Sequence, residues 1–272
     1  MSCYFEHRPF SVGPNKRVYF SPGNLQFLPA KEKTFVNEGM WRFADEQFRI
    51  IGSAYAGDDR WMDLFEWGTG DCPIFNFEAR RYYLFTYDTK NFVDWGNNII
   101  EGDEANTWRT LSKAEWEYLL LPRHTHPTYV SMINGVKGLV IFPDNFFPDN
   151  PMPTRRYSMR IEEWHKLEKL GVVFLPIPNI DGNDKAHGGY WSSSSGIDLR
   201  EYNPHPLLYD RGMRDIVFSA NMSKVISYEV NGGGAFAELF TYNENCPNDN
   251  KISGQHKYMC NAYSVRLVRD IK

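Results

Sequence analysis

Two stretches of the chain carry apolar residues at helical spacing. The first, "TLSKAEWEYLLLP" at 110–122, places three of them on one face of a helix. These three are Trp116, Leu119 and Leu120. Ser112 and Glu115 have the spacing of a capping box, and Pro122 is expected to end the helix. The pattern predicts an amphipathic helix that begins after Ser112.

The second helical stretch is "SMRIEEWHKLEKLG" at 158–171. Its apolar positions are Ile161, Trp164, Leu167 and Leu170. Gly171 fits a C-terminal cap, because glycine readily adopts the left-handed conformation found there. The adjacent carboxylates Glu162 and Glu163 are interpreted as part of its solvated face.

The remaining periodic segments predict strands. "GVVFLPIP" at 171–178 is a continuous apolar run, as expected for a strand that is buried on both faces. "KRVYFSPGNLQF" at 16–27 predicts a strand, a Pro-Gly turn and a second strand. Further candidates are "GGYWSSSS" (188–195), "RDIVFSA" (214–220), "KVISYEV" (224–230), "AFAELFTY" (235–242) and "AYSVRLVR" (262–269). Two helices followed by a run of strands predict an α+β fold.

Alternation within the last of these strands assigns its faces. Val265 and Leu267 are expected to share one face, and Arg266 is expected to point to the other.

Composition and charge narrow the class of protein. A chain of 272 residues with 42% hydrophobic content suits one elaborated domain, which we expect to span 1–272. The net charge of −4, without a basic block, argues against nucleic-acid binding. No apolar run reaches 18 residues, so no membrane insertion is predicted. The N-terminus lacks the pattern of a signal peptide, which predicts either assembly inside the cell or a trimmed chain.

The sequence contains none of the common catalytic motifs that were sought and gives little indication of metal binding. No GxSxG, HExxH, P-loop or GxGxxG sequence occurs. None of the four cysteines forms a CxxC pair. Two of them, Cys246 and Cys260, are interpreted as free thiols, with a disulfide between them as the alternative. His124 and His126 are interpreted as part of a polar loop rather than as a metal-binding pair.

The segment "FPDNFFPDN" at 142–150 repeats Pro-Asp-Asn. Two Asx-type turns are the favoured interpretation, since calcium requires six or more oxygen ligands and no acidic cluster completes such a set. Structural calcium stays an alternative. No catalytic residue, metal site or cofactor is predicted.

Several stretches taken together resemble a known family. They span nearly the whole chain, in the family's order: "FSVGPNKRVYFSPGNLQF", "WRFADEQFRIIGSA", "DLFEWGTGD", "DWGNNI", "WRTLSKAEWEYLL", "GLVIFPDNF", "EWHKLEKLGVVFLPIP", "GGYWSSSS" and "AYSVRLVRD". In these the chain resembles Bacteroidetes and gut-phage proteins of the C-type lectin fold. The branch is the one related to formylglycine-generating enzymes and to the "Fibrobacter succinogenes major paralogous domain".

The resemblance implies a fold with two helices, antiparallel sheets and long loops. It also implies that the first and last strands pair, which here means 17–20 with 264–268. It places Trp191 in the core, where a tryptophan in a strand usually lies.

The resemblance favours binding over catalysis. Formylglycine-generating enzymes use two cysteines near the equivalent of "GGYW", whereas Ser192–Ser195 follow that motif here. The EPN, QPD and WND motifs of calcium-dependent animal lectins are also absent. The expected function is therefore ligand recognition at a phage virion or cell surface, with a host or bacterial surface protein or glycan as partner. The alternatives are a formylglycine-generating-type oxidase and a structural subunit of a surface appendage or virion.

Some proteins of this fold are variable proteins of diversity-generating retroelements. The resemblance then implies that 188–269 holds the ligand-contact residues, since adenine mutagenesis of AAC codons yields Asn, Tyr, Ser, Asp and His among others. The candidates are Ser195, Tyr202, Tyr209, Arg211, Tyr242, Asn243, Asn245, Asn248, Asp249, Asn250, His256 and Tyr258. Tyr, Ser and Asn are also what adaptable binding surfaces use. An ordinary polar hairpin loop is the alternative for the part after 240.

Overall fold

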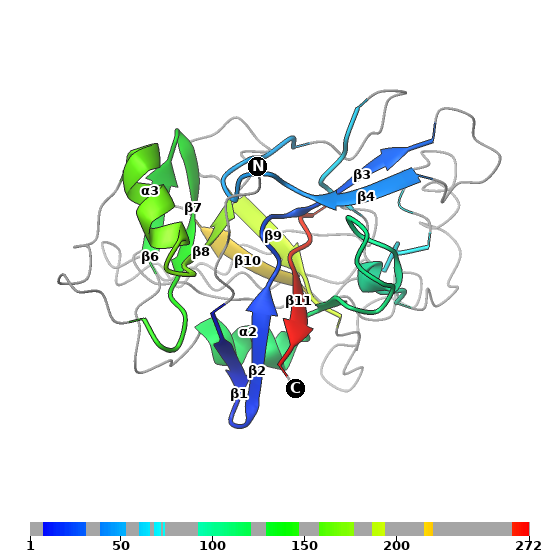
Figure 1. Ribbon diagram of the computed structural model, residues 1–272, viewed down its shortest axis with the longest axis horizontal. Coiled ribbons are helices and arrows are strands. Elements are labelled where there is room, and N and C mark those ends of the chain that lie inside the picture. Colours follow the sequence, from blue (N-terminus) through cyan, green and yellow to red (C-terminus); the bar gives the residue numbers. More distant parts are fainter. Residues whose placement is uncertain are drawn as a thin grey trace, which may run out of the picture.

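Figure 1 presents a computed structural model of the protein. The structure describes residues 8–30, 39–52, 60–65, 68–71, 73, 92–120, 129–146, 158–176, 187–193, 215–219 and 263–271. Within these residues, a few helices accompany sheets whose strands pair antiparallel, so the α+β prediction is confirmed.

One sheet joins the beginning of the chain to its end (Figure 1). It has the order β1-β2-β11-β5, with bounds Phe10–Gly13, Lys16–Phe20, Leu267–Asp270 and Arg109–Thr110. Val268 lies opposite Phe20 in an antiparallel pair, which confirms that the strand predicted at 17–20 pairs with the last strand, whereas β1 precedes it at the edge of the sheet. The paired segment lies further toward the C-terminus than 264–268. The reason is that β2 ends at Phe20, before a Ser-Pro-Gly turn in which proline has no N–H to donate.

The other described strands form three small antiparallel sheets. β3 (Leu25–Pro29) pairs with β4 (Gly39–Phe43), and β9 (His187–Trp191) pairs with β10 (Asp215–Ser219). β7 (Val136–Ile141) lies between β6 (Tyr129–Ile133) and β8 (Val173–Pro176). The strands predicted at 16–27, 171–178, 188–195 and 214–220 are thus confirmed. Those predicted at 224–230 and 235–242 lie outside the described residues.

Helix α2 (Lys113–Leu120) begins at the predicted capping box. The Glu115 N–H donates to Ser112 Oγ at 3.3 Å, and the Ser112 N–H donates to Glu115 Oε2 at 2.7 Å. The predicted apolar face is buried, with Trp116 and Leu119 fully enclosed. A short 3-10 helix, η1 (Trp95–Asn97), precedes β5.

Helix α3 (Ile161–Glu168) buries Trp164, and Gly171 just after its end has a positive φ of +79°, as the predicted glycine cap requires. The Val172 N–H donates to the Leu167 carbonyl at 3.2 Å, which closes the helix end. Leu170 was placed at helical spacing with the apolar positions, but it lies after the helix and is 39% exposed. The helix ends at Glu168, two residues before Leu170, so Leu170 no longer follows the helical spacing.

The core of the described residues has three clusters of buried side chains, and several strands contribute to two of them at once. Tyr190 packs into one cluster and Trp191 into another, as neighbours on a strand point to opposite faces. Trp191 is 1% exposed, which confirms its predicted core position. On β8, Leu175 and Phe174 likewise enter different clusters. The prediction that this strand is buried on both faces is confirmed.

Among the helices of the described residues, none is long and apolar enough to cross a membrane.

Candidate functional site

All twelve predicted ligand-binding residues lie outside the described residues. The same holds for Cys246, Cys260, His124 and His126. The structure does describe 187–193 and 263–271 on either side of residues 194–262, and within these it describes β10 at 215–219.

The two flanks of the 194–262 segment lie side by side. The Trp191 N–H donates to the Ser264 carbonyl at 3.2 Å, and Tyr190 forms a parallel bridge with Ser264. The Trp191 and Tyr263 rings pack edge to face with centroids 4.9 Å apart. Both residues also bond to the same neighbour, since the Trp191 Nε1–H donates to the Phe65 carbonyl at 2.6 Å and the Tyr263 backbone pairs with Phe65. The segment is therefore attached at both ends to one buried cluster.

The first Pro-Asp-Asn repeat is a turn tied to β1. The Phe146 N–H donates to the Pro143 carbonyl at 3.2 Å. The Asp144 carboxylate accepts a hydrogen bond from Ser11 Oγ at 2.7 Å. The turn interpretation thus holds for this repeat, and the second repeat continues outside the described residues.

A buried arginine lies behind the last strand. Arg266 points away from Val265 and Leu267, as alternation predicted, but this second face is also buried and Arg266 is fully enclosed. Its Nη2 donates to Gln47 Oε1 at 2.7 Å, and its Nη1 lies 3.5 Å from Asn24 Oδ1. Burial lowers the pKa of Arg266 to about 10. The guanidinium therefore keeps its positive charge at neutral pH.

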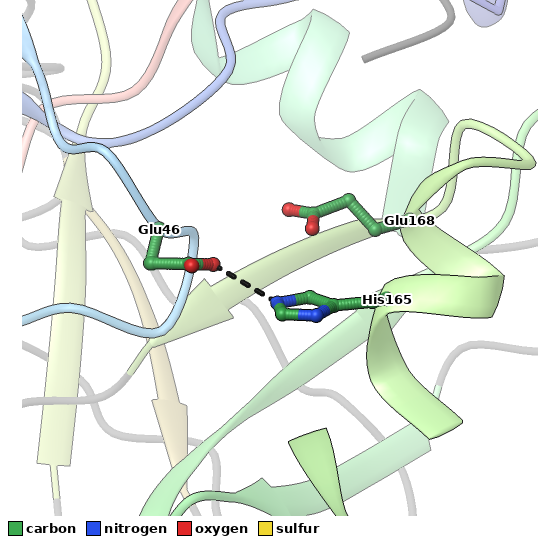
Figure 2. A group of neighbouring side chains, drawn as sticks. All are labelled: Glu46, His165 and Glu168. Atoms are coloured by element: carbon green, nitrogen blue, oxygen red, sulfur yellow. Dashed lines mark hydrogen bonds and ion pairs between the residues drawn. The ribbon is translucent and has the colours of Figure 1, made fainter. Parts of the chain in front are cut away.

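Three side chains with metal-binding atoms gather close to this arginine (Figure 2). Glu46 and Gln47 occupy the turn that follows β4, and His165 and Glu168 stand three residues apart in the last part of α3. His165 Nε2 lies 3.3 Å from Glu46 Oε2. One donor atom from each of Glu46, His165 and Glu168 lies within 4.8 Å of the other two. We call these three residues the Glu-His-Glu cluster.

Gln47 connects the cluster to the buried arginine. Its Nε2 donates to Glu168 Oε1 at 3.0 Å, while its Oε1 accepts from Arg266 and from the Phe174 N–H at 2.9 Å. Glu46 thus faces outward from the turn, and the neighbouring Gln47 is buried beneath it. The buried amide fixes the position of the Glu168 carboxylate.

The electrostatics of Glu168 are unfavourable to its charge. Burial raises the pKa of Glu168, and the negative charge of Glu46 raises it further. The hydrogen bond from Gln47 and the positive charges of His165 and Arg266 act in the opposite direction. Because the effects that raise the pKa prevail, the surroundings of Glu168 do not fully stabilise its charged form.

The arrangement offers one imidazole nitrogen and two carboxylate oxygens to a common point, which is a donor set for a divalent metal ion. The spacing of His165 and Glu168 on a predicted helix is a signal that sequence reasoning missed. Glu46 gave no such signal, because it is more than a hundred residues away along the chain.

A scan against protein-family models, a search of curated proteins and a search of solved structures each find no match to this chain.

Proposed function

We propose that the protein is a recognition protein of the C-type lectin fold, in the branch that resembles formylglycine-generating enzymes. It binds a host or bacterial surface protein or glycan through the candidate residues in 188–269. No chemical step is part of this function.

The observation that carries the proposal is the attachment of the 194–262 segment at both ends. Trp191 and Tyr263, which flank it, are buried in the same cluster and in ring contact. Function commonly resides in segments that a rigid scaffold positions. Apart from β10, which pairs with β9 between these points, the residues of the segment can vary with the ligand while the buried contacts that hold the ends stay unchanged.

Two further features support the fold assignment. The strand at 16–20 pairs with the last strand through Phe20 and Val268, as the family resemblance implies for 17–20. Trp191 also occupies the core position that the resemblance assigns to it. Diversification by a retroelement is the most specific form of the proposal.

The test is a combined substitution of Tyr202, Tyr209, Tyr242 and Tyr258 by alanine in the full chain. The probe is a printed array of glycans and surface proteins, on which the wild-type chain is expected to bind. The combined variant should keep its melting temperature within a few degrees and lose at least tenfold in affinity, because tyrosines dominate many binding surfaces. The control Trp191→Ala should instead lose stability by about 3–5 kcal/mol.

Unchanged binding by the combined variant, or a wild-type chain that binds nothing on the array, would overturn the proposal. The retroelement form has its own test in the gene. A neighbouring template repeat that differs from codons 190–269 only at adenines is expected, together with a reverse transcriptase.

A further inference from the structure

We propose that Glu46, His165 and Glu168 bind one divalent transition-metal ion, with Zn²⁺ as the ion that fits best. This site is separate from the ligand-binding residues of the proposed function, and neither proposal depends on the other.

The distances suit a shared ion. Two ligands that lie about 2.0–2.1 Å from a tetrahedral zinc ion are roughly 3.3–3.4 Å apart. His165 Nε2 and Glu46 Oε2 are separated by 3.3 Å. The third donor atom, from Glu168, lies within 4.8 Å of both, so a small side-chain rotation brings it to the same ion.

Two of the three proposed ligands come from the same helix, so the helix alone places them close together. His165 and Glu168 are neighbours on one face of α3, since residues three apart on a helix lie side by side. Glu46 comes from the turn after β4, in which the Arg49 N–H donates to the Glu46 carbonyl at 3.0 Å. Figure 2 shows both carboxylates and the imidazole directed toward one another from these two elements.

The cluster lacks partners for its negative charge. Within the described part of the chain, Gln47 is the one hydrogen-bond donor to Glu168, and it reaches Oε1. Its other oxygen, Oε2, has no donor among those residues. Among the described residues, the Glu46 carboxylate pairs with His165 at 3.3 Å, and the charge of Arg49 acts on it from further along the turn. Two carboxylates therefore face one imidazole, and a divalent cation would balance them.

Buried residues behind the Glu-His-Glu cluster hold one of its ligands in place. Gln47 is fully buried, and three hydrogen bonds other than the one to Glu168 hold its amide. Such outer partners orient metal ligands and are characteristic of built metal sites. Arg266 contacts Gln47 through Oε1 rather than the Glu168 carboxylate, so it supports Gln47 without occupying the ligand position.

The donor set selects the type of ion. Calcium and magnesium prefer oxygen ligands alone, whereas imidazole with carboxylates suits zinc and its neighbours in the first transition row. Three protein ligands leave a fourth position open to water or a ligand. The His165 and Glu46 side chains are 40% and 37% exposed, so solvent reaches that position.

The test is calorimetric titration of the EDTA-treated full chain with ZnCl₂ at pH 7. Other histidines and cysteines of this chain also have affinity for zinc, so the decisive quantity is a difference between variants. The triple variant Glu46→Gln, His165→Ala, Glu168→Gln should bind one ion fewer than wild type. Each single variant should weaken binding at this site at least tenfold. The matched control Glu162→Gln, an exposed carboxylate on the same helix, should change nothing.

Two further measurements keep the result unambiguous. Circular dichroism checks that each variant is folded, and His165→Asn replaces His165→Ala if the alanine variant is not. Co²⁺ titrated into wild type should give a visible absorption band that the triple variant lacks. A triple variant with wild-type stoichiometry and Kd would overturn the proposal. Displacement of Zn²⁺ by equimolar Ca²⁺ would overturn the assignment to a transition metal.

Discussion

Two partly buried carboxylates, Glu115 and Glu168, differ in how the fold treats their charge. Burial acts against the charge of Glu115, but hydrogen bonds from Arg109, Lys16 and the Ser112 N–H outweigh it and hold its pKa near 2. Burial also acts on Glu168, and there it prevails, so that the pKa of Glu168 is raised. One carboxylate is stabilised in its charged form and the other is not.

The contacts of Glu115 explain its low pKa. Arg109 donates to both of its oxygens at 2.8 and 2.9 Å, and Lys16 Nζ lies 2.7 Å from Oε1. Arg109 also pairs with Asp270 at 2.6 Å. These ion pairs tie α2 and β5 to the strand that ends the described chain, so this cluster serves the fold.

The contacts of Glu168 lead to the opposite conclusion. Its described donor is Gln47, and its nearest charged neighbours include a second carboxylate, Glu46. This protein pairs the charge of Glu115 closely with basic side chains, but leaves the charge of Glu168 incompletely paired. Incomplete pairing in a partly buried cluster is typical of sites that function, rather than of sites that stabilise. Four substitutions test this difference between the two carboxylates.

The largest effect is expected from Arg266→Ala. This change leaves a cavity, removes the charge-assisted bond to Gln47 and removes the positive charge behind Glu168. We expect a loss of about 3–5 kcal/mol in the free energy of unfolding, measured by urea denaturation. Arg269→Ala on the same strand is the control. Arg269 stacks 5.5 Å from the Tyr19 and Trp108 rings, and its loss should cost about 1 kcal/mol or less. Equal losses would contradict a special role for Arg266.

The next effect is expected from Glu115→Gln, and it depends on pH. The folded pKa of Glu115 near 2 lies below its value in the unfolded chain. Its contribution is therefore complete above about pH 5 and is lost as pH falls toward 2. Urea unfolding should show a loss of roughly 2–3 kcal/mol at pH 7 that disappears near pH 2. A loss that is constant from pH 7 to pH 2 would show that the charge of Glu115 is not its cause.

The substitution Glu168→Gln should change the free energy of unfolding in the opposite direction, as a gain in stability. A carboxyl group whose folded pKa is raised costs stability as pH rises above its value in the unfolded chain, and the cost is complete above the folded pKa. The amide keeps an oxygen for the bond from Gln47 and removes the charge. We expect the metal-free variant to gain up to about 1 kcal/mol at pH 7, and to show less gain as the pH is lowered. A loss of stability at pH 7 would mean that the charge of Glu168 stabilises the fold.

The smallest effect is expected from His165→Ala without metal. The ion pair between His165 and Glu46 is more than a third exposed on both sides, and such pairs contribute little. Thermal unfolding in EDTA should differ from wild type by about 1 kcal/mol or less. With saturating Zn²⁺ the wild-type chain should unfold at a higher temperature and the variant should not, because only the former gains from binding. A variant that zinc stabilises equally would place the ion elsewhere.

Local signals predicted much of the fold. The capping box at Ser112 and the glycine cap at Gly171 depend on neighbouring residues, and both formed as expected. The β6–β7 hairpin also had a local signal. Asn134 and Gly135 both have positive φ, at 48° and 78°, and Asn-Gly is the preferred pair for such a two-residue turn. Sequence reasoning predicted no strand at 129–141 and thus missed this signal.

The candidate site was predictable in part. His165 and Glu168 share a helix that the sequence predicts, and their spacing alone puts them side by side. Their partners Glu46 and Gln47 come from a turn whose position depends on how β4 packs. No pattern within residues 45–49 indicates which helix that turn will meet.

Local sequence patterns define the start of α2, the glycine cap after α3, the apolar strands, and the opposition of Arg266 to Val265 and Leu267. These follow from φ/ψ preferences, hydrogen bonding to near neighbours and side-chain alternation, which act over a few residues. Only the tertiary structure decided that the second face of that strand is buried and that Glu46 meets α3. Burial and contacts across more than a hundred residues depend on which elements pack together, and that is a property of the whole fold.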